Sequence, residues 1–274
     1  MRKLTYNKVL VNFFDKIRIT SGARQDDILL TYNGKELKIS GISQKQVYEE
    51  ALNNIGRLHH SQLKWVERLK TTIDWDTTWE SVHNILSTNK AKTTVWQQIH
   101  LNFYTQYSYN RWHKSKDPCP LCLQTPHDIY HLILDCDFTN ALWEDLQPLL
   151  KELHPAPITE EEKSFGLIQK KKTNGILLRN WITYLTRDCV SQEEREAYTT
   201  KTPNLEKTKA KLNRKMHFEI NKNFMRFKNE QNLASFEKII THANVLCRQT
   251  GDDKYELRQI FEQNTIFSPL HIKI

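Results

Sequence analysis

Four residues in the middle of the chain have the types and the spacing of a metal site. Cys119, Cys122, His131 and Cys136 form the pattern C-x2-C-x8-H-x4-C. Two thiolates separated by two residues can bind one side of a metal ion from a tight turn, and the later His and Cys can complete the other side. Three sulfurs and one imidazole nitrogen satisfy tetrahedral Zn²⁺, with no coordination position left for a substrate. The pattern therefore predicts one structural zinc ion rather than a catalytic metal.

Two alternative interpretations of this segment remain open from the residues alone. His127 is a rival ligand, because C-x2-C-x4-H-x8-C also describes the sequence. We favour His131, since the H-x4-C spacing keeps the second ligand pair close in space. A redox-active C-x-x-C would expect a βαβ context, which the sequence does not indicate.

The other cysteines fit a reducing environment. Five is an odd number, and three of the five fall within the metal motif, which favours a metal site over a disulfide framework. Cys189 and Cys247 stand alone on apolar helical faces. We expect both to be buried core thiols.

Positive charge is concentrated in one segment. The chain has a net charge of +8, and residues 201–228 hold nine Lys or Arg against two Glu. Such a stripe can neutralise phosphates without reading sequence, although a solvated helix face is an equally simple explanation. The candidate phosphate contacts in this segment are Lys207, Lys211, Arg214, Lys215 and Lys222.

A second basic stretch precedes the first cysteine and is mixed with aromatic residues. Exposed aromatic side chains beside cations can stack bases and bind phosphates. The candidate nucleic-acid contacts here are Arg111, His113, Lys114 and Lys116.

Helical periodicity dominates the rest of the chain. Only seven Gly and eight Pro argue against an all-β fold, and apolar residues recur at helical spacing in several segments, as at Leu212, Met216, Ile220 and Phe224. Thr77-x-x-Glu80 has the form of a capping box, and Asp137 can cap a helix directly after the last ligand. Residues 28–32 and 37–40 can pair as a hairpin around Asn33-Gly34.

We therefore predict a mainly α fold, with helical bundle-like segments organised around a small CCHC zinc unit and one short β-hairpin near the N-terminus. Two prolines in residues 153–159, followed by an acidic cluster, mark a boundary. The expected organisation is a helical N-terminal segment (1–60), a zinc-binding domain (61–155) and a helical basic segment (156–274).

Several classes of protein are disfavoured. No apolar run reaches the roughly 18 residues of a membrane span, and the N-terminal VLVNFF is too short for a signal sequence. We expect an intracellular protein of the nucleus or cytoplasm. There is no glycine-rich phosphate loop, no serine nucleophile elbow and no H-E-x-x-H, so we do not expect an enzyme.

The central segment resembles the zinc-binding region that follows the reverse transcriptase domain in LINE-type (non-LTR) retrotransposons. The resemblance is specific over residues 60–152 and looser over 40–60 and 163–230. The positions that match the family pattern are Trp96, His100, Cys119, Cys122, His131, Cys136 and Trp143.

The resemblance implies an accessory domain that contacts template RNA or target DNA, RNA being the more expected partner, next to an upstream reverse transcriptase domain. The polymerase and endonuclease motifs of such elements are missing from the chain. We therefore expect the C-terminal fragment of such a polyprotein, with Met1 once an internal residue. A second hypothesis is a zinc-folded protein-interaction scaffold without affinity for nucleic acid, and a third is a redox enzyme that uses Cys119 and Cys122.

Overall fold

The computed structural model divides the chain into two compact units, residues 1–60 and 61–274. It describes residues 29–32, 35–38, 60–83, 86–103, 105, 117–124, 128–169, 171–200, 202–251, 254–261 and 267–270. In the first unit, β1 (Leu29–Tyr32) and β2 (Lys35–Lys38) pair antiparallel, with Tyr32 opposite Lys35. This register confirms the hairpin expected around Asn33-Gly34, although its second strand begins two residues earlier than predicted.

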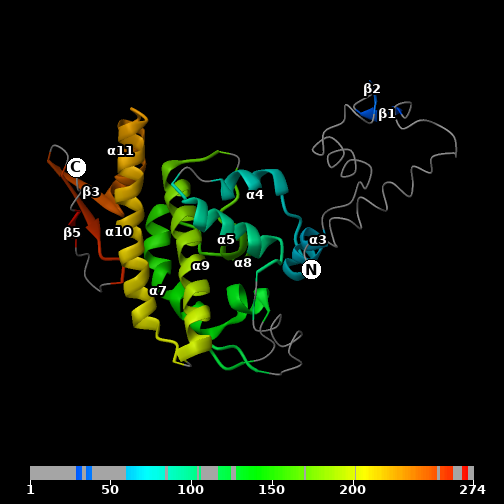
Figure 1. Ribbon diagram of the computed structural model, residues 1–274. Coiled ribbons are helices and arrows are strands. Elements are labelled where there is room, and N and C mark those ends of the chain that lie inside the picture. The colour runs from blue at the N-terminus through cyan, green and yellow to red at the C-terminus, as the bar shows by residue number, and fades with distance from the viewer. Residues whose placement is uncertain are drawn as a thin grey trace. The chain divides into compact units, whose positions relative to one another are not determined.

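The second unit is mainly helical, as predicted (Figure 1). Its helices are α3 (His60–Leu69), α4 (Trp75–Val82), α5 (Asn89–Ile99), the π-helical turn η3 (His131–Asp135), α7 (Asp137–Leu153), α8 (Glu160–Phe165), α9 (Asn174–Thr200), α10 (Leu205–Asn229), α11 (Leu233–Ile240) and the 3₁₀ turn η4 (His242–Asn244). This unit contains both the zinc-binding segment and the basic segment, and their proposed division at residue 155 stays a prediction.

A small antiparallel sheet follows α11 and was not predicted. Its strands β3 (Cys247–Gly251), β4 (Lys254–Arg258) and β5 (Phe267–Leu270) lie in that order. Tyr255 and Leu257 alternate inward and are buried, whereas the intervening Glu256 is only partly covered. Alternation over so few residues is too short to distinguish a strand from a helix, which is why the sequence indicated a helix throughout this segment.

Two helix boundaries differ from the sequence expectations. Helix α4 begins at Trp75, because the Asp74 side chain accepts the backbone N–H of Thr77 and caps the helix before the Thr77-x-x-Glu80 box. Helix α7 begins at Asp137, with Cys136 rather than Asp137 in the cap position. Helix α5 ends at Ile99, so Phe103 packs into the core from beyond the helix.

Helix α9 lies at the centre of this unit and packs against α5, α7, α10 and α11. Its apolar residues Leu178, Trp181, Leu185 and Cys189 are almost fully buried. Cys189 and Cys247 are both fully buried, which confirms that both are core thiols, but Cys247 begins strand β3 and does not lie on a helical face as expected. Burial raises the pKa of each thiol to about 12. Because helices cover α9 on several sides, its polar residues are buried as well and each needs a partner.

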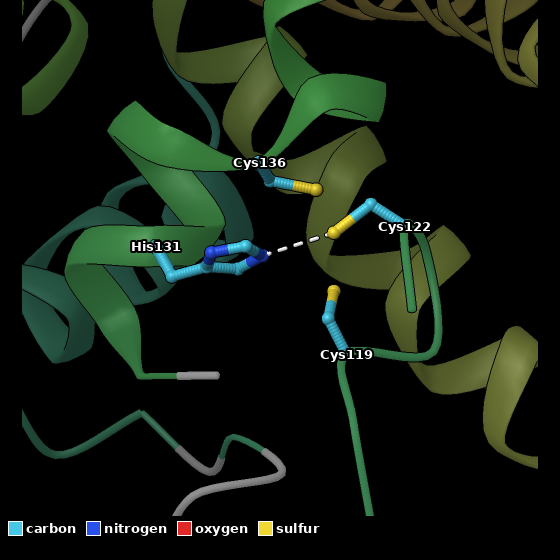
Figure 2. Close-up of side chains that lie close together, drawn as sticks. All are labelled: Cys119, Cys122, His131 and Cys136. Carbon is cyan, nitrogen blue, oxygen red and sulfur yellow. Dashed lines mark hydrogen bonds between the residues drawn. The ribbon is translucent and has the colours of Figure 1, made fainter. Parts of the chain in front are cut away.

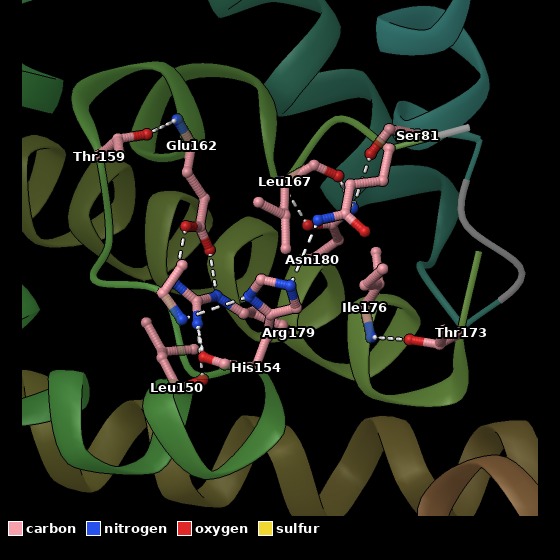
Figure 3. Close-up of polar contacts among 12 residues, drawn as sticks. Ser81, Leu150, His154, Thr159, Glu162, Leu167, Thr173, Ile176, Arg179 and Asn180 are labelled. Atoms are coloured by element: carbon pink, nitrogen blue, oxygen red, sulfur yellow. Dashed lines mark hydrogen bonds and ion pairs between the residues drawn. The ribbon is translucent and has the colours of Figure 1, made fainter. Parts of the chain in front are cut away.

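The most deeply buried polar contact of α9 is an ion pair with α8 (Figure 3). Arg179 is 0% exposed and Glu162 2% exposed. The guanidinium donates to both carboxylate oxygens of Glu162, at 2.5 and 2.7 Å, and to the backbone carbonyls of Leu150 (2.7 Å) and His154. Arg179 thus fastens the C-terminal end of α7 and the short helix α8 to the central helix.

Replacing Glu162 with Gln should destabilise the fold. The change leaves the buried Arg179 guanidinium without a counter-charge, and losing one partner of a buried pair typically costs about 3–5 kcal/mol. Urea unfolding followed by circular dichroism measures the loss. The exposed neighbour Glu160 provides the matched control, since Glu160→Gln should change stability by less than about 1 kcal/mol. Equal effects of the two substitutions would contradict the proposed role of the buried pair.

Candidate metal centre and basic helix

The first two cysteines lie on a tight turn. The backbone N–H of Leu123 donates to the carbonyl of Cys119 (2.8 Å), and that of Cys119 donates to the carbonyl of Gln124 (2.8 Å). Leu123 adopts a left-handed conformation with φ of 63°, and the N–H of Leu121 points at the Cys119 sulfur at 3.4 Å. The turn therefore directs both thiols to one side and supplies a backbone donor to one of them.

The other two residues stand at the ends of a π-helical turn. Asp128 accepts the backbone N–H of His131 (2.9 Å), and the N–H of Cys136 donates to the carbonyl of His131 (2.7 Å). This five-residue hydrogen-bonded turn fits the H-x4-C spacing, and π-helical turns of this kind are frequent at functional sites. Helix α7 starts at the next residue, so the last cysteine also marks the beginning of a core helix.

All four side chains converge on one point (Figure 2). Their ligand atoms lie within 4.8 Å of one another, and the Cys122 sulfur and His131 Nε2 lie 3.2 Å apart. Cys119 and Cys136 are fully buried, and Cys122 lies at the edge. The group predicted from the spacing is therefore assembled in the fold with His131 in it. His127, the rival ligand, lies outside the described residues.

The electrostatics favour one thiolate in the cluster when no ion is bound. A hydrogen bond from Cys119 and a further one from His131 lower the pKa of Cys136 to about 3. The same bond to Cys136, together with burial, raises the pKa of Cys119, and burial raises that of Cys122. Burial lowers the pKa of His131, but its hydrogen bond to Cys136 and the neighbouring negative charges outweigh this and raise it.

The donor set fits zinc. Ligands at zinc distances of about 2.0–2.3 Å in a tetrahedron stand roughly 3.3–3.8 Å from one another, and the four atoms here are already within about an ångström of that spacing. With three sulfurs and one nitrogen the coordination is complete. The group can hold one metal ion in a structural, closed site.

A polar contact ties the two halves of the site together outside the ligands. The Gln124 side chain, at the end of the cysteine turn, donates to the Asp137 carboxylate at 2.6 Å. Asp137 is the first residue of α7. The sequence indicated Asp137 as a helix cap, but its side chain is used to hold the cysteine turn against the helix start.

The predicted basic residues of α10 divide into two groups. The first group faces acidic residues of α9: Lys207 contacts Glu196 at 3.0 Å, and Lys211 contacts Glu193 and Glu196 at 3.1 and 2.8 Å. Lys215 pairs with the buried Asp188. These lysines help to dock α10 on α9. Counting the charges along the sequence does not reveal this role.

The second group, Arg214 and Lys222, lies on the outward face of α10 and is exposed. The exposed positions of the helix beyond Lys207 are Ala210, Arg214, Phe218, Lys222, Met225, Lys228 and Asn229. None of these is acidic, so every charged side chain on this face is basic. The remaining candidates, Arg111, His113, Lys114 and Lys116, lie outside the described residues.

The fold and the site together define a helical protein with a closed Cys₃His metal centre. Residues 45–143 match a protein family described as zinc-binding in reverse transcriptase. The match includes all four residues of the cluster and ends at Trp143, a core residue of α7. No curated protein and no solved structure shows significant similarity to the chain.

In the part of the chain that the structure describes, no helix is long and apolar enough to cross a membrane.

Zinc content should depend on the four clustered residues. The purified protein should contain about one zinc ion per chain, and Cys136→Ser and His131→Ala should lose most of it, because a structural site needs all four ligands. Mass spectrometry of the metal content measures this. His127→Ala serves as the matched control and should keep its zinc. Loss of zinc from His127→Ala with retention in His131→Ala would instead establish His127 as the ligand.

Zinc affinity should increase with pH. Since the pKa values of Cys119 and Cys122 are raised, both thiols hold their protons in the metal-free cluster, whereas Cys136 is already a thiolate. Binding then releases the protons of both thiols and of His131, whose pKa is also raised, so the apparent affinity should fall by about 100-fold or more when the pH is lowered by about one unit near neutrality. Competition titration against a chromophoric chelator at several pH values tests this. A pH-independent affinity would contradict it.

Proposed function

We propose that this chain is a zinc-folded, nucleic-acid-binding accessory module of a LINE-type reverse transcriptase, without catalysis of its own. It contacts template RNA or target DNA beside an upstream reverse transcriptase domain. The supporting observation is the convergence of Cys119, Cys122, His131 and Cys136 in the segment that matches a zinc-binding family of reverse transcriptases. In this proposal those four residues bind one Zn²⁺.

The geometry of the site supports a structural role for the metal. Four protein donors are enough to satisfy tetrahedral zinc, whereas a catalytic zinc would need an open position for water or substrate. The site also links the cysteine turn to the start of α7, whose residues Leu142, Trp143 and Leu146 belong to the core. Binding of the ion therefore stabilises the fold that presents the rest of the surface.

The outward face of α10 supports contact with nucleic acid. Arg214, Lys222 and Lys228 are exposed there, and no carboxylate is exposed between Lys207 and Asn229 on that helix. Cations presented in this way neutralise phosphates and release counterions, which gives affinity without base specificity. The paired lysines Lys207, Lys211 and Lys215 contribute less, because their acidic partners already offset their charge.

A protein-interaction scaffold is the second candidate, and one observation favours it. Phe218 and Met225 are 63% and 37% exposed on the same face of α10, and exposed large apolar side chains can mark a docking surface. The two candidates differ in the effect of salt. Contacts with phosphates weaken steeply as salt rises, whereas an apolar interface does not.

Charge reversal on the outward face should abolish binding to nucleic acid. The triple variant Arg214→Glu, Lys222→Glu and Lys228→Glu replaces exposed cations with carboxylates that repel phosphates. For the unmodified protein, the logarithm of the association constant should fall steeply with the logarithm of salt concentration, by about 0.7 per phosphate contact on a single strand. Fluorescence anisotropy with labelled RNA and DNA measures both effects.

The matched control reverses charge elsewhere on the surface. Lys64→Glu with Lys151→Glu changes exposed lysines of α3 and α7 and should leave most of the affinity intact. A flat salt response of the unmodified protein, or equal losses in the two sets of variants, would refute the proposed role of α10.

A further inference from the structure

Two further cations stand at the start of α5, which a hydrogen bond places beside α10 although the two helices are far apart in the sequence. Lys90 and Lys92 occupy the first turn of α5, where the helix dipole is already positive. The side chain of Asn223 in α10 donates to the carbonyl of Leu86, just before α5, at 2.8 Å. Because Asn223 and Leu86 are both buried, this contact fixes the start of α5 beside α10.

The like charges of the two helices are close enough to act on one another. Burial lowers the pKa of Lys92, and Arg226 of α10 lowers it further. Burial likewise lowers the pKa of Lys215, and Lys90 lowers it further. Repulsion of this kind favours an anion that can lie between the two helices.

Fewer carboxylates than cations interact at this junction among the described residues. Two carboxylates face the group: Asp188, which pairs with Lys215, and Glu219, which interacts with Lys90, Lys215 and Lys222 and whose pKa is raised by burial. Against these two stand five cations: Lys90, Lys92, Lys215, Lys222 and Arg226. Among these named groups of the described residues, the cations therefore outnumber the carboxylates.

An exposed aromatic ring adjoins this junction. Phe218 is 63% exposed and lies one helical turn from both Arg214 and Lys222, directly before Glu219. A ring with an open face can stack on a nucleic-acid base, and such stacking tolerates any base. The base faces of a duplex are covered by their neighbours, and a protein partner would need matching acidic side chains. A single strand offers phosphates and open bases together.

We propose that the first turn of α5 and the outward face of α10 form one surface that binds single-stranded nucleic acid. Lys90, Lys92 and Lys222 contact phosphates, and Phe218 stacks on an unpaired base. This inference rests on the nucleic-acid binding proposed above. It adds that α5 takes part in the binding surface, that the Phe218 ring stacks on a base and that the ligand is single-stranded.

The experiment compares two variants of the full zinc-loaded chain by fluorescence anisotropy over a series of salt concentrations. The probes are an unstructured single-stranded RNA of about 15 nucleotides, the DNA of the same sequence and the corresponding duplexes. Lys90→Gln with Lys92→Gln removes charge from α5 alone and should reduce the salt slope on single strands by about 1.4, at about 0.7 per contact. Phe218→Leu keeps the apolar surface but removes the ring, and should weaken single-strand binding roughly ten-fold without changing the slope.

Matched controls separate these effects from damage to the fold. Lys64→Gln and Leu63→Ala change exposed residues of α3 and should bind like the unmodified protein. Zinc content and thermal unfolding of every variant should remain unchanged, and removing Lys92 should not destabilise the protein because it relieves repulsion from Arg226.

The outcomes distinguish this inference from the proposed function. If the unmodified protein binds neither single strands nor duplexes, the proposed function fails. If it binds but the α5 and Phe218 variants bind equally well, nucleic-acid binding stands and this surface is wrong. A preference for duplex that Phe218→Leu leaves intact also overturns the stacking role. Light scattering that shows a dimer dissociated by Phe218→Leu would assign the face to a second copy of the chain instead.

Discussion

The burial of a polar helix is the constraint on which the second unit depends. Helix α9 is covered by α5, α7, α10 and α11, yet it has arginines, threonines and carboxylates among its buried residues. A buried polar group without a partner costs more than most packing contacts supply. Each neighbour of α9 is therefore positioned by the partner that it offers as well as by its apolar residues.

These polar partners lie on both α5 and α10. Arg187 donates to the Gln98 side chain at 2.7 Å, and Gln98 in turn donates to Ser191 at 2.9 Å, so α5 is held against α9 by polar contacts as well as packing. Asp188 accepts from Thr94 of α5 at 3.1 Å and pairs with Lys215 of α10. One carboxylate of α9 thus contacts both α5 and α10.

Features that depend on spacing within a short segment could be predicted from the sequence. Contacts between residues that are distant in the chain could not. The four clustered ligands, the apolar stripe from Leu212 to Phe224 and the N-terminal hairpin are local patterns, and the structure contains them. The pairing of Lys211 with Glu193 and the hydrogen bond between Asn223 and Leu86 join residues distant in the chain. Such contacts produce no periodic pattern in the sequence from which they could be predicted. Boundaries such as the start of α4 were also missed, because Asp74 and Thr77 both have capping side chains and only packing selects between them.

The π-helical turn limits how the metal motif can vary in length. His131 and Cys136 are joined by one hydrogen bond across five residues, and α7 begins at the residue after Cys136. An inserted residue in this turn would rotate α7 by about 100° about its axis relative to the imidazole. Leu142, Leu146 and Leu149 would then leave the core side of the helix. Insertions and deletions between His131 and Asp137 are therefore excluded by the core of the protein, independently of what the metal itself requires.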